Sequence, residues 1–166
     1  MKIAISLFIV LMIFSCHKPV ASEITKVEFA KGTCLGPCVP IAISIDNSLN
    51  YKLYADSFIY IKPKYKKVNY VGKIDRQLWD DLIAKLKNAD YKHPDTSKKI
   101  EIADVQHSEL IIYYDHKKLR IYEPDKKFDD VMALLDTSYK MIKLQPTNSK
   151  LQFGTTLQIP LNLYER

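Results

Sequence analysis

The sequence predicts an α+β fold in which a mainly antiparallel sheet carries two helices packed on one face. Short runs of alternating apolar and polar residues occur in pairs with turn residues between them, which is typical of antiparallel hairpins. Two other segments place apolar residues three and four positions apart, as amphipathic helices do. A chain of 166 residues suits a single domain, and the sequence contains no internal repeat and no low-complexity tract.

The first residues are not expected to belong to this domain. Lys2 precedes an apolar run from Ile3 to Phe14, interrupted only by Ser6, which is too short for a permanent membrane span and is typical of a signal peptide over residues 1–15. The run ends in Ile13-Phe14-Ser15-Cys16, which resembles the lipobox of bacterial lipoproteins. This resemblance implies that Cys16 is lipidated and becomes the new N-terminus. The alternatives are an uncleaved anchor or an ordinary secretory signal cleaved near Ala21-Ser22.

Lipidation of Cys16 predicts a membrane-tethered protein of the bacterial envelope. Two or three acyl chains, palmitate among them, anchor a protein stably, whereas a single chain has only marginal membrane affinity. Residues 16–23 then form a tether and residues 24–166 form the domain. No acidic cluster of the kind that marks surface export follows Cys16. We therefore favour a periplasm-facing position on the outer membrane.

The charge of the chain restricts its partners. The net charge of +6 falls to +5 when Lys2 is removed with the signal peptide. A basic balance can indicate a nucleic-acid partner, but an exported domain does not meet nucleic acid. We expect no nucleic acid, and we expect anionic lipid headgroups and acidic envelope polymers as neighbours.

The first predicted strands lie on both sides of a segment that contains Cys34 and Cys38. The run Ile24 to Phe29 alternates in part and predicts a strand. The run Ile41 to Ile45 alternates more clearly, and the turn residues Asp46-Asn47-Ser48 lead from it into a run from Asn50 to Tyr54. These two runs predict a hairpin whose apolar face carries Ile41, Ile43 and Ile45.

A lysine-rich segment follows this hairpin. Lysines are concentrated between Lys62 and Lys67, and a strand is expected from Val68 to Gly72. Lysines interleaved with Tyr60, Tyr65 and Tyr70 are one way to bind a polyanion. We favour the other interpretation, a solvated edge whose lysines discourage pairing with further strands.

The first helix is expected directly after Ile74. Asp75 is a suitable N-cap, and the segment ends at Asn88-Ala89-Asp90. One apolar stripe should pack on the sheet, and it comprises Leu78, Trp79, Leu82, Ile83 and Leu86. The next segment, from Tyr91 to Asp104, has no clear periodicity and predicts an exposed loop.

A second hairpin, a second helix and a tail complete the chain. The runs Glu109–Tyr114 and Leu119–Tyr122 flank a polar tip from Asp115 to Lys118. The second helix begins near Asp125, ends between Asp136 and Tyr139, and has an apolar stripe of Phe128, Val131, Met132, Leu134 and Leu135. Residues 142–166 are expected to form a tail that wraps the domain or adds a short strand.

Cys34 and Cys38 are the only thiols left once Cys16 is lipidated, and they flank Leu35-Gly36-Pro37. In an oxidising compartment this spacing favours a structural disulfide, which contributes about 2 kcal/mol in the chain-entropy model. A redox-active pair is the alternative, but thioredoxin-like sites place two residues between the cysteines and a helix after them. A metal site would need two further ligands.

The remaining polar residues do not form a known catalytic or metal-binding pattern. His93, His107 and His116 occur singly, without metal-ligand spacing. The pairs Asp80-Asp81 and Asp129-Asp130 are expected on solvated helix faces. The sequence lacks a nucleophile elbow, a glycine-rich phosphate loop and a paired-histidine zinc helix. We therefore predict no catalytic residue, no metal and no cofactor.

The order of these features resembles a domain family of unknown function found in bacterial lipoproteins. The resemblance covers Ile24 to Ile142, and its sharpest element is the cysteine loop, which in the family is Cys-Phe-Gly-x-Cys-Pro followed by an aromatic residue. This chain departs from that motif with Val39 before Pro40, and with Ile41 in the position of the aromatic residue. The resemblance implies the fold, export and the disulfide, and it carries no catalytic residue.

The sequence therefore favours a non-enzymatic binding or accessory module, tethered to the envelope membrane and able to meet an envelope protein partner. Two alternatives stay open. One is a periplasmic redox enzyme that uses Cys34 and Cys38. The other is an immunity or inhibitor lipoprotein that neutralises a toxin or an envelope enzyme.

Overall fold

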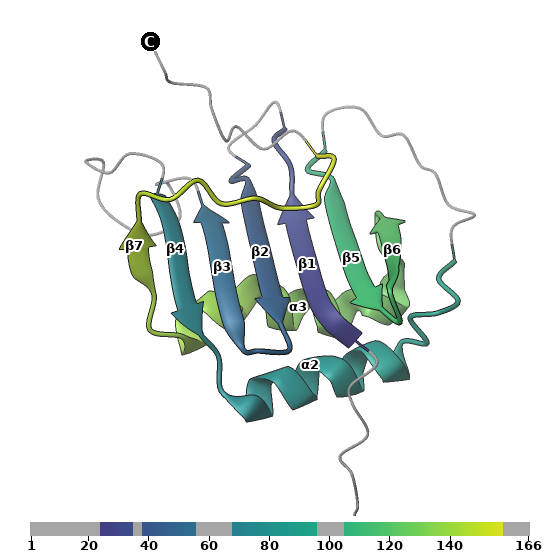
Figure 1. The fold of residues 1–166 in the computed structure, drawn as a ribbon. Coiled ribbons are helices and arrows are strands. Elements are labelled where there is room, and N and C mark those ends of the chain that lie inside the picture. Colours follow the sequence, from purple (N-terminus) through teal and green to yellow (C-terminus); the bar gives the residue numbers. More distant parts are fainter. Residues whose placement is uncertain (1–23, 35–37, 56–67, 96–104, 158–166) are drawn as a thin grey trace, which may run out of the picture.

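The computed structural model of the protein describes residues 24–34, 38–55, 68–95 and 105–157. One antiparallel sheet has seven strands in the order β6-β5-β1-β2-β3-β4-β7 (Figure 1). The bounds of the strands are β1 Ile24–Lys31, β2 Ile41–Asp46, β3 Asn50–Ala55, β4 Val68–Lys73, β5 Ser108–Tyr114, β6 Lys117–Tyr122 and β7 Gln145–Thr147. The predicted α+β class and the predicted hairpins are confirmed.

Two helices, α2 (Arg76–Asn88) and α3 (Asp129–Ser138), lie on the same face of this sheet (Figure 1). The main core lies between the helices and the sheet. On β2 it takes the three alternate residues that were predicted to face it, Ile41, Ile43 and Ile45. We call this the helix face of the sheet and the opposite one the outer face.

The first hairpin turns through the predicted polar residues. Oδ1 of Asp46 accepts hydrogen bonds of 3.0 Å from the backbone amides of Ser48 and Asn50. Leu49 takes a left-handed backbone conformation with φ of 64°. The carboxylate of Asp46 thus satisfies the amides of a turn that leads directly into β3.

The second hairpin has a shorter turn than the sequence indicated. Asp115 and His116 both have positive φ, 44° and 60°, which is typical of the tight two-residue turn favoured between antiparallel strands. We expected a four-residue tip from Asp115 to Lys118, but β6 begins at Lys117, which pairs with Tyr114. Two consecutive lysines in a sequence favour the prediction of a loop. Here the tight turn at Asp115 and His116 sets the register of the two strands, and both lysines belong to β6.

Helix α2 begins where the sequence predicts. Oδ1 of Asp75 accepts a hydrogen bond of 2.7 Å from the amide of Leu78, as an N-cap does. The five residues of the predicted stripe are all buried, and Trp79 is only 1% exposed. The stripe therefore anchors the helix to the sheet.

The segment after α2 was predicted to be an exposed loop, and at Tyr91 that prediction is wrong. Tyr91 is buried and packs edge-to-face against Tyr114 of β5, with 5.2 Å between ring centroids. Asp90 has a φ of 46° and ends the helix by reversing the chain. A single aromatic residue in a polar segment carries no periodicity, so the sequence did not reveal this contact.

The second helix starts with a short 3-10 turn, η3 (Lys126–Phe128). Asp125 accepts a hydrogen bond of 3.0 Å from the amide of Lys127 and so marks the predicted start. At the other end of α3, the hydroxyls of Tyr51 and Ser138 are 2.8 Å apart. Because the Ser138 hydroxyl donates to the carbonyl of Leu135 at 2.7 Å, Tyr51 is the donor in this pair. Burial raises the pKa of Tyr51 and keeps this donor protonated.

The C-terminal tail does both things that were predicted for it. After a second 3-10 turn, η4 (Tyr139–Met141), it adds β7 to the edge of the sheet beside β4. Residues 148–157, which we call the strap, then cross the outer face from β7 towards β5 (Figure 1). Phe153 and Leu157 of the strap pack against Ala30, Ala42 and Tyr54.

Several predictions fall outside the described residues. They are the signal peptide over residues 1–15, lipidation of Cys16, the tether over residues 16–23 and the lysine-rich loop before β4. Within the described ranges, no helix combines the length and apolarity needed to cross a membrane.

Candidate functional site

The cysteine loop connects β1 to β2, which are neighbours near the centre of the sheet. Cys34 and Cys38 are joined as a disulfide, with Cα atoms 5.6 Å apart, in agreement with the predicted pairing. The intervening residues 35–37 are outside the described ranges. The disulfide closes the loop just beyond the end of β1.

A second brace holds the same loop without using the disulfide. Nε2 of Gln106 donates hydrogen bonds to the carbonyls of Gly32, at 3.0 Å, and Val39, at 2.9 Å. The amide of Gly32 in turn donates to the carbonyl of His107 at 2.8 Å. One side chain from the segment before β5 therefore joins the two ends of the cysteine loop.

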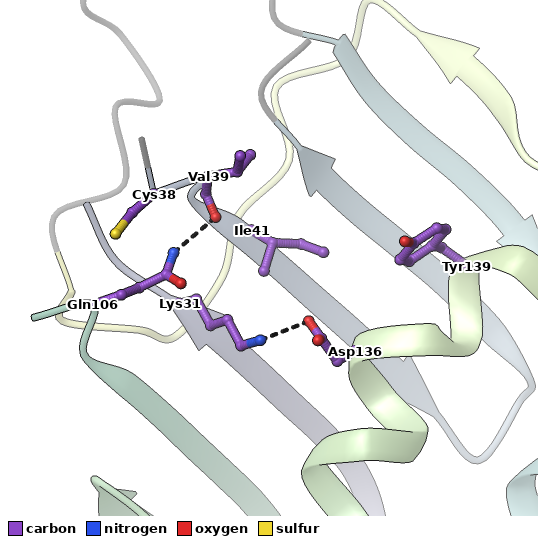
Figure 2. Close-up of a pocket in the computed structure, with 7 residues that line it drawn as sticks. All are labelled: Lys31, Cys38, Val39, Ile41, Gln106, Asp136 and Tyr139. Atoms are coloured by element: carbon purple, nitrogen blue, oxygen red, sulfur yellow. Dashed lines mark hydrogen bonds and ion pairs between the residues drawn. The ribbon is translucent and has the colours of Figure 1, made fainter. Parts of the chain in front are cut away.

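A cleft of about 430 Å³ opens beside this braced loop, at the junction of the sheet and the end of α3 (Figure 2). This volume lies in the range that takes small molecules or a few residues of a peptide. The residues that line the cleft are Lys31, Cys38, Val39, Ile41, Gln106, Asp136 and Tyr139. We call it the loop cleft.

An ion pair spans one wall of the loop cleft. Nζ of Lys31, the last residue of β1, is 2.9 Å from Oδ1 of Asp136 on α3 (Figure 2). Their side chains are 30% and 41% exposed, so water screens the pair and it contributes at most about 1 kcal/mol to stability. For binding, the pair matters because it holds a cation and an anion at fixed positions in the wall of the cleft.

The loop cleft offers charged, polar and apolar groups that a ligand could contact. Lys31 and Asp136 can form ion pairs with charged groups of a ligand. The Gln106 amide oxygen has no hydrogen-bond partner among the described residues, so it can accept a hydrogen bond. Ile41 forms an apolar part of the wall. The lining residues include no histidine to act as a base and no serine or threonine to act as a nucleophile. The sequence analysis identified Cys38 as a candidate site residue, but it did not connect Gln106, Asp136 and Tyr139 with the cysteine loop.

A second cluster, which the sequence analysis missed, lies under the strap. Glu28 of β1 and Glu109 of β5 are 3% and 1% exposed, although both are charged residues on the outer face of adjacent strands. Buried carboxylates are retained only when their oxygens are satisfied. Here the strap satisfies them.

Glu109 is the more fully enclosed of the two. Its carboxylate accepts hydrogen bonds from Arg120, from the hydroxyls of Thr155 and Thr156, and from the amide of Thr156 at 2.9 Å. Burial alone would raise the pKa of this carboxyl, but the bonds from Thr155, Thr156 and Arg120 outweigh burial and lower the pKa below its usual value. Glu109 is therefore an ionised anchor for the strap.

Glu28 holds the strap at Gly154. Oε2 of Glu28 accepts a bond of 2.8 Å from the Gly154 amide and one of 3.2 Å from the Tyr113 hydroxyl. Oε1 pairs with Lys26 at 2.9 Å and accepts a bond from Ser44. Every oxygen of both carboxylates is thus used within the fold, which makes this cluster structural and not catalytic.

No group of three or more potential metal ligands occurs among the described residues. The three histidines in the described ranges lie on separate segments. His93 follows α2, His107 precedes β5 and bonds Glu123 at 3.0 Å, and His116 is in the second hairpin turn.

Comparison with known proteins gives a single result. A family profile described as "Domain of unknown function (DUF6438)" matches residues 25–144, which is more than half of the chain. No curated protein and no solved structure matches significantly. The matched range begins in β1 and ends just before β7, so it includes the loop cleft and leaves out the strap.

Proposed function

The chain belongs to the DUF6438 family, a domain family of unknown function, and from this premise we propose that it is a membrane-tethered envelope lipoprotein acting as a non-enzymatic binding module through the loop cleft. Family membership brings no activity with it, so the proposal depends on the residues of this chain. The lipid anchor would be on Cys16. The partner would be an envelope protein that inserts a short polar segment into the cleft.

The position of the cleft relative to β1 is the observation that carries this proposal. β1 runs from Ile24, where the proposed tether would join it, to Lys31 at its opposite end (Figure 1). Lys31 is one of the residues that line the loop cleft. Eight residues of strand span about 25 Å. A domain anchored through its N-terminus would therefore present the cleft away from the membrane, where a partner can reach it.

The composition of the cleft supports a peptide ligand. An extended peptide segment has backbone N–H groups that can donate hydrogen bonds to the Gln106 amide oxygen. Its charged side chains can form ion pairs with Lys31 and Asp136. Both loop ends are already fixed by Gln106 and by the disulfide, so binding would cost little ordering of the loop. This preorganisation is what a recognition surface requires.

Site-specific photo-crosslinking in intact envelopes tests the binding role. A photo-reactive phenylalanine analogue at Val39 would face the cleft, while the Val39 carbonyl that bonds Gln106 is kept. We expect a discrete crosslinked partner from this position and none from the same analogue at the exposed Lys87 of α2. The product should disappear when Asp136→Lys reverses one charge of the cleft. Equal products from both positions would refute the cleft as the binding surface.

The anchor is tested separately by the mass of the mature N-terminal peptide. We expect a diacylated or triacylated Cys16, and Cys16→Ser should abolish that mass and release the protein from the membrane fraction. An unmodified Cys16 in the parent would refute the lipoprotein assignment. If the crosslinked partner is an envelope enzyme that the protein inhibits, the module is of the inhibitor type.

A redox role is the second candidate, because Cys38 is among the residues that line the cleft. In that role a substrate dithiol bound there would be oxidised to a disulfide. Cys34 and Cys38 would take up its two electrons and two protons and become thiols. Replacing both cysteines by serine separates the two roles. A redox enzyme loses thiol exchange, whereas the binding module keeps its crosslinked partner.

A further inference from the structure

The outer face carries four lysines from four strands, and one of them, Lys118, also contacts the strap at Gly154. The strand registers place Lys118, Tyr113, Lys26, Asp46, Asn50 and Lys73 in one row across β6, β5, β1, β2, β3 and β4. Lys52 lies in the adjacent row, opposite Ser44. We call Lys26, Lys52, Lys73 and Lys118 the lysine face.

The positive charge of the lysine face is largely uncompensated. Lys26 is paired with the buried Glu28, but Lys52, Lys73 and Lys118 have no carboxylate within ion-pair distance among the described residues, and all three are exposed. Asp46 is the one acidic residue in the row. Both of its oxygens already accept hydrogen bonds in the first hairpin turn.

Tyr113 lies between two of the lysines and holds them over its ring. The ammonium of Lys26 is 3.9 Å from the ring centroid, and that of Lys118 is 5.6 Å from it. The solvent side of the helices is different, because Asp80, Asp81, Asp129 and Asp130 are exposed there beside Lys87 and Lys126. Arg76 and Lys127 are exposed on that side as well, so the solvent side of the helices is mixed in charge.

This face also lies at the end of the sheet where the tether enters. Lys26 is two positions after Ile24, the first residue of β1, and both hairpin turns are at the same end of the sheet (Figure 1). The tether of residues 16–23 reaches at most about 29 Å when fully extended. The strap crosses the outer face towards the other end of the sheet, and it meets this row at Gly154, whose carbonyl accepts a 3.5 Å hydrogen bond from Nζ of Lys118.

We propose that the lysine face lies against the anionic headgroups of the membrane that holds the chain, an inference that rests on the lipid anchor proposed above. Lys73 and Lys118 are five strand spacings apart, which is about 24 Å, so a nearly flat band of charge would meet several headgroup phosphates. In this orientation the lysine face and the tether are next to the bilayer, and the loop cleft points away from it.

Lysine labelling of the purified full-length lipoprotein in vesicles tests this orientation. One set of vesicles would contain phosphatidylglycerol and phosphatidylethanolamine, and the other phosphatidylcholine alone. An amine-reactive reagent and mass spectrometry then give the modification rate of each lysine. We expect Lys52, Lys73 and Lys118 to be modified severalfold more slowly on the anionic vesicles, and Lys87 and Lys126 to react equally on both.

Two double variants and a change of salt concentration test whether the protection depends on the charge of the lysine face. Lys52→Glu with Lys118→Glu should remove the protection of Lys73, and the matched pair Lys87→Glu with Lys126→Glu should leave it unchanged. Raising the salt to about 1 M, where the Debye length is about 3 Å, should remove the protection in the parent as well. All four substituted lysines are exposed, and thermal unfolding of each variant would verify the fold.

The outcome also separates this inference from the anchor. A lipidated Cys16 with equal lysine reactivity on both vesicle types would overturn the lysine face while the anchor stands. An unlipidated Cys16 would overturn the anchor. In that case, slower modification on anionic vesicles would still support the lysine face, and equal rates would refute it.

Discussion

The backbone amide of Gly154 donates a 2.8 Å hydrogen bond to the buried carboxylate of Glu28, which lies 126 positions earlier in the chain. This contact joins the strap to the central strand β1. A Cβ atom on residue 154 would be 2.5 Å from the Tyr113 hydroxyl and 2.7 Å from Oε2 of Glu28. Any larger residue here would push the Tyr113 hydroxyl or the Glu28 carboxylate out of its present hydrogen bonds.

Gly154→Ala should therefore loosen the strap and destabilise the domain. We expect a loss of about 1–3 kcal/mol in the free energy of unfolding, as for other substitutions that overpack a buried contact. Denaturant unfolding measures this loss, and proteolysis should cut the strap faster in the variant. Gln152→Ala, at an exposed position of the same strap, is the control and should change neither. An unaltered cleavage rate in Gly154→Ala would argue against the strap contact.

Glu109→Gln should destabilise the domain more than removal of an exposed carboxylate. The substitution keeps the shape of the side chain but leaves Arg120 without its anionic partner and turns one accepting oxygen into a donor amide opposite Thr155 or Thr156. We expect a loss of about 2–4 kcal/mol. The matched control is Asp80→Asn on the solvent side of α2, which should change stability by less than about 0.5 kcal/mol.

The same residue should give the domain a specific sensitivity to acid. Hydrogen bonds hold the pKa of Glu109 below its usual value of 4.5, so its ionised form stabilises the folded state. This contribution is complete above pH 4.5 and is lost as the pH falls through the lowered folded-state pKa. Unfolding measured at a series of pH values should show this loss in the parent. In Glu109→Gln the acid decline should be shallower, and identical pH profiles would contradict the prediction.

The disulfide and the Gln106 hydrogen bonds should each be able to hold the cysteine loop when the other is removed. Replacing Cys34 and Cys38 by serine should cost about 2 kcal/mol of stability, because the loop-closure constraint is lost. Gln106→Ala removes two hydrogen bonds and should cost about 1–2 kcal/mol. Because each brace limits the freedom of the same loop, the combined variant should lose more than the sum of the two. A double-mutant cycle with no coupling would show that the braces act independently.

Local patterns in the sequence predicted the elements but not what covers the outer face. The alternation in β1 correctly assigns Val27 and Phe29 to the helix face and Glu28 to the other face. Period-two alternation cannot tell whether water or a later segment of chain meets that second face. The alternation therefore gives no sign that Glu28 and Glu109 are buried. One signal was present in the small residues Ala30 and Ala42, which leave room on the outer face for Phe153 and Leu157.

The loop cleft could be predicted only in part for a similar reason. Cys38 was evident from its type and spacing. Gln106 comes from the segment before β5, and Asp136 and Tyr139 come from the end of α3 and the start of η4, and only the folded chain brings these two segments to the cysteine loop. Lys31 lies two positions after Phe29, where the first strand was predicted to end, and was not singled out. Side-chain contacts between distant segments leave no periodic pattern, so a single sequence gives no basis for choosing them.

The central place of β1 determines how the domain would respond to mechanical load. A pull between a membrane anchor before Ile24 and a partner seated beyond Lys31 would run along the axis of this strand. β1 is hydrogen-bonded on both sides, to β2 and to β5, and antiparallel hydrogen bonds lie perpendicular to the strands. The load would shear two ladders at once instead of opening them one bond after another. A domain held from both ends of β1 would therefore have to break both ladders together before this strand could leave the sheet.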